Sequence, residues 1–158
     1  MRLSTLSVLV GATMFGCGSD PLSLETSGLV GAWRSQIQVL QPQGSMEGLF
    51  VVTVRGRAED HTITRGLYQG QSPDDLSSEQ VLYGRIEVGT NKFIIYPDSL
   101  VTRDLFYGPS YRSVQRDFTG TSGDSTSYVI RGNELQLEYY SYPADAPVLT
   151  QRVLYRVR

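Results

Sequence analysis

Cysteine and histidine, two residue types that often carry chemistry, each occur once in the 158 residues, as Cys17 and His61. A protein metal site usually needs three or four ligands, and the donors beside His61 are only Glu59 and Asp60. A catalytic triad needs a histidine with a nucleophile in a sharp turn, but the sequence has no Gly-x-Ser-x-Gly pattern. We therefore expect no metal, no cofactor and no enzyme activity, and we expect His61 in an exposed turn.

Arg65 is a candidate for ligand binding because it lies between Ile63 and Leu67 in an alternating pattern. If Ile63 and Leu67 point into a core, Arg65 points inward with them. A buried charge is costly unless it is paired, so an inward Arg65 would meet an anionic ligand or a carboxylate. The alternative is a local bulge that turns Arg65 outward.

Residues 97–125 form the least regular long segment. Aromatic side chains alternate there with arginines: Phe106, Tyr107, Tyr111 and Phe118 with Arg103, Arg112 and Arg116. Long irregular loops are often functional, and aromatic residues and arginine are enriched in binding hot spots. We expect either a loop that contacts a ligand or docks a protein, or two further strands at Ser99–Leu105 and Ser113–Phe118. On the loop hypothesis Phe106, Tyr107 and Tyr111 are the candidate ligand contacts.

Cys17 follows a stretch that has the properties of a signal peptide. Arg2 precedes the uncharged run Leu3–Phe15, which is shorter than the ~20 apolar residues that span a bilayer but fits an export signal. Met14-Phe15-Gly16-Cys17 resembles the lipobox of bacterial lipoprotein precursors, in which a small residue precedes the cysteine that receives lipid. The resemblance implies cleavage of residues 1–16 and lipid attachment at Cys17.

A lipobox also implies where the protein would reside. Residues 17–28 would form a flexible tether to the membrane, and Gly18 after the cysteine favours the outer membrane, facing the periplasm. The alternatives are a plain secretory signal, which would give a secreted or soluble periplasmic protein without Cys17, or a buried free thiol. The net charge of −2 argues against a nucleic-acid partner.

Residues 29–158 are expected to form one all-β domain, because apolar and polar residues alternate with a period of two. The expected strands are residues 33–39, 48–57, 62–69, 79–88, 92–96, 127–131, 134–142 and 149–158. Gly132-Asn133 suits a two-residue hairpin turn, and a turn is expected near Glu59-Asp60. About eight strands joined by hairpins favour a single antiparallel up-and-down barrel, with a β-sandwich as the alternative.

Gly31-Ala32-Trp33 resembles the Gly-x-Trp motif of lipocalin and avidin-like barrels. The resemblance implies that Trp33 closes one barrel end and packs against an arginine of the last strand, either Arg156 or Arg152. The stretch from Tyr128 to Leu137 is similar to the C-terminal hairpin of bacterial lipocalin-like lipoproteins.

Two function hypotheses follow. In the first, a membrane-anchored, non-catalytic lipoprotein binds a small apolar or amphipathic ligand, with Trp33, Arg65, Phe106, Tyr107 and Tyr111 as candidate contacts. In the second, a structural or assembly lipoprotein docks another envelope protein through residues 97–125. Side-chain size separates them, because an eight-stranded barrel filled by large inward side chains leaves little room for a ligand. The large side chains in question are Trp33, Phe50, Tyr139 and Tyr155.

Overall fold

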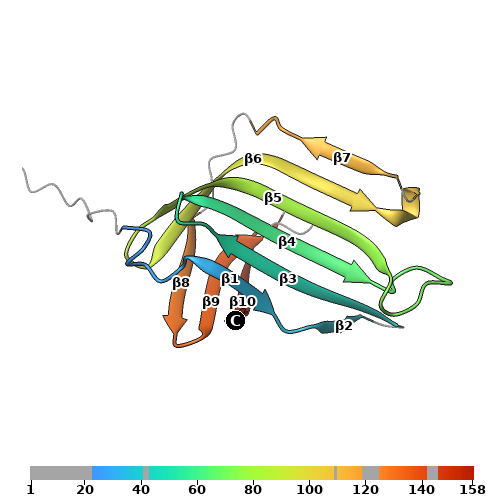
Figure 1. Ribbon diagram of the computed structural model, residues 1–158, viewed down its shortest axis with the longest axis horizontal. Coiled ribbons are helices and arrows are strands. Elements are labelled where there is room, and N and C mark those ends of the chain that lie inside the picture. Colours follow the sequence, from blue (N-terminus) through green and yellow to red (C-terminus); the bar gives the residue numbers. More distant parts are fainter. Residues whose placement is uncertain (1–22, 41–42, 109, 119–124, 142–145) are drawn as a thin grey trace, which may run out of the picture.

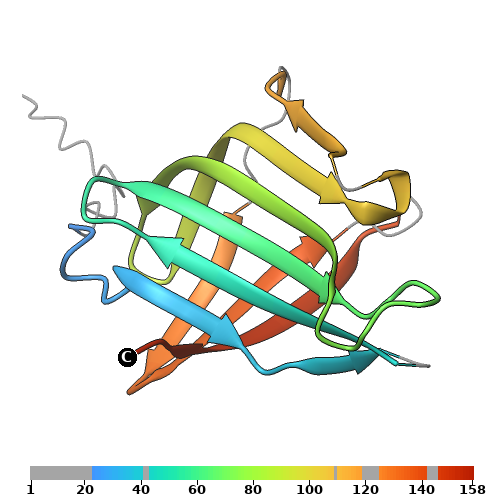
Figure 2. The ribbon, with the colours of Figure 1, turned by 45° about the vertical axis from the view of Figure 1, so that its right-hand side comes forward.

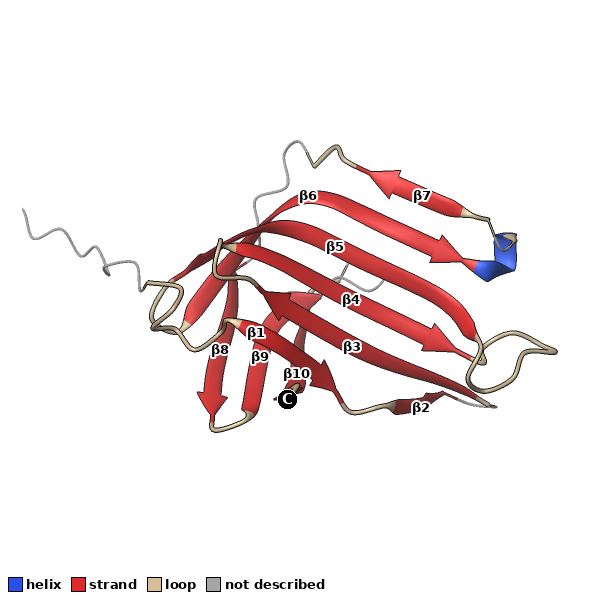
Figure 3. Cartoon of the chain, viewed as in Figure 1, coloured by secondary structure: helices blue, strands red, loops and turns tan. Residues whose placement is uncertain are grey.

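The computed structural model describes residues 23–40, 43–108, 110–118, 125–141 and 146–158. These residues form a ten-stranded sheet and one three-residue 3-10 helix, and none of their helices is long and apolar enough to cross a membrane (Figure 3). In chain order the elements are β1 (Gly31–Ser35), β2 (Gln38–Leu40), β3 (Gly44–Val52), β4 (Arg57–Arg65), β5 (Leu76–Val88), β6 (Lys92–Asp104), the helix η1 (Leu105–Tyr107), β7 (Arg112–Gln115), β8 (Ser125–Arg131), β9 (Glu134–Ser141) and β10 (Val148–Arg156).

The antiparallel sheet closes on itself (Figure 1). Consecutive strands pair from β3 to β6, β6 pairs with β8, and the pairing continues through β9 to β10. β1 completes the ring, because Trp33 lies opposite Arg156 of β10 on one side and Phe50 of β3 on the other. The described strands therefore include a closed eight-stranded barrel, to which β2 and β7 are added. The expected all-β antiparallel barrel is confirmed in preference to the β-sandwich.

The two ends of the barrel differ (Figure 2). At the end that we call the closed end, the short connections at residues 53–56, 89–91 and 132–133 lie with residues 23–30, which precede β1. At the opposite end, which we call the open end, lie the longer connection 66–75 and η1. The described pairing of β6 with β8 is confined to Lys92–Ile94, and nearer the open end β6 pairs with β7 instead. Among the described residues, the barrel wall is therefore discontinuous toward the open end.

Register and alternation identify the inward side chains. Trp33 and Phe50 are opposite one another and both are buried, so alternate residues from Phe50 along β3 share their face. Across β3, β4, β5 and β6 the inward rows are Phe50–Asp60–Leu82–Leu100, then Gly48–Thr62–Gln80–Thr102, then Met46–Thr64–Ser78–Asp104 at the open end. The two rows nearest the open end are thus mostly polar.

The hydrophobic core fills the closed-end half of the barrel. Its buried residues come from the segment before β1 and from the strands around it: Leu29, Trp33, Phe50, Val52, Ala58, Ile86, Val88, Phe93, Tyr128, Leu135, Leu137 and Leu154. Phe50 and Phe93 stack with ring centroids 5.6 Å apart. Tyr155, considered above as an inward residue, is 39% exposed. The core is therefore solid at one end without extending through the whole barrel.

The first expected strand, residues 33–39, is interrupted. Trp33 of β1 pairs with Phe50, whereas Gln38 of β2 pairs with Met46, which shifts the register by one residue. A one-residue shift exchanges the two faces of a strand. As a result Gln38 takes the inward position and Val39 is 76% exposed.

The turn expected near Glu59-Asp60 is wrong. The connection between β3 and β4 lies at residues 53–56, where the Thr53 N–H donates to the Arg57 carbonyl at 2.9 Å. Gly56 supplies the positive φ of 73° that this turn requires. Consequently Glu59 and Asp60 lie within β4, and both β3 and β4 begin earlier than expected.

β6 continues past Tyr96, where its end was expected. The register shifts between Gly84–Pro97 and Tyr83–Ser99, which leaves Asp98 as an extra residue. Because proline lacks an N–H, it fits in a sheet at such an irregularity. The expected piece Ser99–Leu105 is the continuation of β6, and β7 overlaps the expected piece Ser113–Phe118. The described part of residues 97–125 is therefore largely strand.

Replacing Gly84 with alanine is expected to destabilise the barrel by about 1–3 kcal/mol, the usual cost of overpacking. A Cβ at Gly84 would lie 2.6 Å from the Ile95 side chain and 2.6 Å from the Tyr96 carbonyl oxygen, so the β5–β6 pairing must shift. Urea denaturation measures the loss. Gly89→Ala is the matched control, because the nearest atom to its Cβ is at an ordinary 3.5 Å; equal losses in both variants would contradict the packing argument.

Candidate functional site

Trp33 seals the closed end. Its side chain is fully buried, and its indole N–H donates to the Leu29 carbonyl at 2.8 Å. The Arg156 guanidinium carbon lies 4.1 Å from the Trp33 ring centroid, and the same group donates to the carbonyls of Val30 and Gly28. Of the two arginines considered for this position, Arg156 occupies it. Trp33 therefore belongs to the core, away from any opening.

Arg152 crosses the interior midway along the barrel. Its Nη1 donates to Asp60 Oδ1 at 2.7 Å, and so joins β10 to β4, which are not neighbours in the sheet. Gly48 makes room for the guanidinium, because a Cβ there would lie 2.1 Å from Nη2. The side chains of Arg152 and Asp60 remain 18% and 33% exposed. This ion pair lies at the boundary between the apolar core and the polar rows.

Above the ion pair the interior is lined by hydrogen-bonding side chains. We call this space the polar cup; its inward residues are Met46, Thr62, Thr64, Ser78, Gln80, Thr102 and Asp104 on one wall, with Tyr139, Thr150 and Arg152 opposite. Thr62 and Gln80 are exposed although they face inward. By contrast Val81, which points outward from β5, is only 5% exposed. Because Thr62 and Gln80 point inward and are nevertheless exposed, the polar cup is open to solvent.

Three pockets have Arg152 in their lining, and one of them, of about 230 Å³, lies along β8, β9 and β10. The other two meet beside the polar cup. One has a volume of about 270 Å³ and includes Met46, Gly48, Thr62, Tyr139 and Thr150 in its lining. The other, of about 310 Å³, lies against residues 36–37 and β10 and shares Ser35, Gln38, Gln151 and Arg152 with the first. Among the described strands β2 pairs with β3 and not with β10, so the second pocket reaches Arg152 through a gap in the wall.

A fourth pocket, of about 710 Å³, lies near the closed end, with Leu24, Phe93, Ile94 and Ser125 in its lining. Residues 1–22 and 119–124 adjoin it in the chain and lie outside the described residues. We assign no site to this pocket.

An aromatic cluster lies at the rim of the open end. Tyr68, Phe106, Tyr107 and Tyr111 contact one another in sequence, with centroid distances of 5.5, 5.3 and 4.9 Å. Phe106 and Tyr107 are 70% and 67% exposed. Asp104 fixes the cluster, because its Oδ1 accepts from the Tyr68 hydroxyl at 2.8 Å and from the Phe106 N–H at 2.9 Å. The three expected contacts Phe106, Tyr107 and Tyr111 thus lie together, outside the polar cup.

The Asp104 carboxylate raises the pKa of Tyr68 above its usual value, mainly through the hydrogen bond, with further contributions from desolvation and charge repulsion. Asp104→Asn, which keeps an acceptor but removes the charge, is expected to lower this pKa. Because the pKa of Tyr68 is raised in the folded state, its protonated hydroxyl stabilises the fold. This contribution to stability is complete below the ordinary tyrosine pKa of about 10 and is lost as the pH rises through the folded-state pKa. A ¹³C-tyrosine NMR titration measures the shift; an unchanged Tyr68 pKa in the variant would contradict this assignment.

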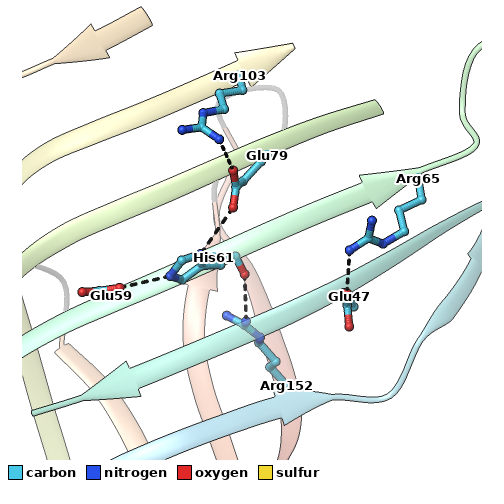
Figure 4. Close-up of polar contacts among 7 residues, drawn as sticks. All are labelled: Glu47, Glu59, His61, Arg65, Glu79, Arg103 and Arg152. Atoms are coloured by element: carbon cyan, nitrogen blue, oxygen red, sulfur yellow. Dashed lines mark hydrogen bonds and ion pairs between the residues drawn. The ribbon is translucent and has the colours of Figure 1, made fainter. Parts of the chain in front are cut away.

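His61 lies on the outer face of β4, within a row of charged residues (Figure 4). Its Nε2 is 3.3 Å from Glu59 and its Nδ1 is 3.7 Å from Glu79, which in turn contacts Arg103 at 3.6 Å. The expected exposed turn is wrong, because the His61 side chain is only 15% exposed within a strand. The described residues contain no group of three or more ligands that could hold a metal ion. We interpret this row as a charged outer surface.

Arg65 also lies on the outer face. Its Nη2 is 3.5 Å from Glu47 Oε1, and Glu47 alternates with the inward residues Met46 and Gly48 (Figure 4). Thr64 is inward, so Ile63 and Arg65 are both outward by alternation, and Arg65 keeps the register of β4 to β3 by pairing with Ser45. A register shift does follow Thr64, but its extra residue, Ser77, lies on β5. Arg65 therefore does not line the polar cup, and Arg152 provides the interior arginine instead.

From the sequence, Arg152 is expected only as a partner for Trp33 and Asp60 only in a turn, so their interior ion pair was not predicted. The alternation of Arg152, Leu154 and Arg156 was a usable signal, because these three share a face. Cys17 lies outside the described residues.

No protein-family model matches the chain, and no curated protein matches its sequence. The class of protein is therefore defined by the fold alone. The chain contains a small antiparallel up-and-down β-barrel, compatible with a lipocalin-like fold, with one sealed end and one polar, open end.

Proposed function

We propose that this chain is a lipid-anchored lipoprotein of a bacterial cell envelope whose barrel binds a small amphipathic ligand without catalysis. The observation that carries the binding proposal is the polar cup: the interior above Asp60 and Arg152 is open, whereas the closed-end half is filled. Ligand sites are typically concave and carry a few convergent polar groups that orient the ligand. A purely apolar ligand fits the open interior less well, because the two inward rows nearest the open end are mostly polar.

Native purification of the chain from membranes, followed by mass spectrometry under mild conditions, tests ligand binding. We expect a small molecule to purify with the wild-type protein and to be lost from Arg152→Ala. Leu149→Ala, which changes an outward, exposed residue of the same strand, is the control and should retain it. If the wild type and both variants retain the small molecule equally, the polar cup is not its binding site.

The anchoring proposal rests on the resemblance of residues 14–17 to a lipobox. The full chain with Cys17→Ser is expected to leave the membrane fraction, because thioether-linked acyl chains are the proposed anchor. Ser19→Ala is the matched control. A Cys17→Ser protein that still fractionates with membranes would contradict lipid anchoring.

The second candidate function is docking of another envelope protein through the aromatic cluster. The observation that favours it is the exposure of Phe106 and Tyr107, which project at the rim although both are large and apolar. A protein that purifies in stoichiometric amount with the wild type, but not with Phe106→Ser/Tyr107→Ser, would support docking.

A further inference from the structure

We infer that the polar cup selects a neutral, polyhydroxylated head group, such as a sugar, over anionic and cationic head groups. This inference rests on the proposed function, because it names the class of ligand for the same site. It is carried by the charge balance of Asp60 and Arg152 and by the hydroxyl and amide groups around them.

The ion pair makes the floor of the polar cup electrically neutral. The other inward carboxylate, Asp104, lies in the row nearest the open end, where it accepts hydrogen bonds from the Tyr68 hydroxyl and the Phe106 N–H. Arg152 donates to Asp60 at 2.7 Å, so each charge already has its counter-ion. A ligand carboxylate bound to Arg152 would approach Asp60, and a ligand ammonium bound to Asp60 would approach Arg152. Charged head groups therefore meet like-charge repulsion or must separate the pair, and either effect disfavours them.

A hydroxyl group meets neither penalty. A guanidinium only donates hydrogen bonds and an ionised carboxylate only accepts them, whereas a hydroxyl does both. Asp60 and Arg152 together thus offer an acceptor next to a donor. Thr62, Tyr139 and Thr150 line one pocket together with Arg152, and their hydroxyls can both donate and accept. This arrangement suits a head group with several adjacent hydroxyls.

The interior rows also exclude an apolar group at this depth. Thr62, Gln80 and Thr102 span the wall from β4 to β6 in one inward row, and burying them beneath a hydrocarbon would leave their polar atoms without partners. The exposed aromatic cluster lies one row nearer the open end, where Asp104 is inward. An amphipathic ligand would therefore enter with its polar head first and leave its apolar part at the rim.

Three amphiphiles built on eight-carbon chains test the inference by isothermal titration calorimetry below their micelle concentrations: n-octyl β-D-glucoside, octanoate and octyltrimethylammonium. The protein is the full chain with Cys17→Ser, so that no lipid is attached. We expect the glucoside to bind at least about tenfold more tightly than either charged amphiphile. Removing one charge should invert the selectivity: Asp60→Asn should favour octanoate, and Arg152→Gln should favour octyltrimethylammonium.

Folding of each variant is checked by the fluorescence of Trp33, the single tryptophan, which lies at the closed end. Gly48→Ala gives a further variant, because it displaces the Arg152 guanidinium without changing the charge and should weaken glucoside binding. Equal or tighter binding of a charged amphiphile to the unsubstituted cup would overturn the head-group inference and leave the proposed function in place. Failure of all three amphiphiles to bind would overturn the proposed function itself.

Discussion

Replacing Trp33 with alanine is expected to lower the free energy of unfolding by about 3–5 kcal/mol, the usual cost of truncating a large buried aromatic residue. Trp33 is fully buried, contacts the Arg156 guanidinium and donates to the Leu29 carbonyl. The substitution thus removes core packing, a cation–π contact and the partner of a buried carbonyl at one position. Urea denaturation followed by circular dichroism measures the loss.

Tyr155→Ala is the control for Trp33→Ala. Tyr155 is an aromatic residue of the adjacent strand, but it points outward and is 39% exposed. Its truncation should cost about 1 kcal/mol or less, as is usual for a surface substitution. A Trp33→Ala loss of similar size would mean that Trp33 does not seal the barrel.

Removing one member of the interior ion pair is expected to have the second largest effect. Asp60→Ala leaves Arg152 partly buried and without its carboxylate, and should cost about 2–3 kcal/mol, less than for a fully buried pair because both side chains retain some exposure. Asp60→Ala/Arg152→Ala should cost less than the sum of the single variants, with a coupling energy of about 1–3 kcal/mol. Chemical denaturation of the four proteins measures the cycle.

The chain supplies a matched control pair on its surface. Arg57 and Asp98 form an ion pair in which the side chains are 50% and 47% exposed. Its double-mutant cycle should give a coupling energy below about 1 kcal/mol, because solvent screens exposed charges. A coupling energy for Asp60 and Arg152 no larger than this value would show that the interior pair does not hold the walls of the barrel together.

The division into a solid half and an open half follows from these energetics. The closed-end half buries the large apolar side chains, including the stacked rings of Phe50 and Phe93. Stability supplied there allows the rows nearer the open end to carry polar side chains that face solvent. The trans-barrel contact between Arg152 and Asp60 then limits how far the two walls separate at the boundary.

Part of this architecture was predictable from local patterns. The strands around Gly132-Asn133 were predicted closely, because a two-residue turn and strict alternation determine both position and register. The Gly-x-Trp resemblance pointed to Trp33 and to an arginine of the last strand, and Arg156 occupies that position.

The rest depended on irregularities that alternation cannot locate. The register shift between β1 and β2 exchanges the two faces, so Gln38 is inward and Val39 exposed. The extra residue Asp98 lets β6 continue past Pro97. A single inserted residue reverses every later side chain of its strand. Pro97 indicates an irregularity beside Asp98, but it does not by itself show that the strand continues beyond it.

The polar cup was not predicted from the sequence, for a different reason. Its ion pair joins residues 92 positions apart in sequence, on strands that are not neighbours in the sheet. Such a contact follows from closure of the barrel and from the space that Gly48 leaves. Arg65, which alternation favoured as the interior arginine, lies instead on the outer face beside Glu47.

Mapping where an amphiphile binds tests the central claim most directly. In a ¹H–¹⁵N NMR titration of the full chain carrying Cys17→Ser with n-octyl β-D-glucoside, we expect the largest shifts at Thr62, Gln80, Tyr139, Thr150 and Arg152, with little change around Trp33. Shifts that cluster instead around the closed-end pocket at Leu24, Phe93 and Ile94, or on the outer row at His61, would contradict the account of a barrel sealed at one end and receptive at the other.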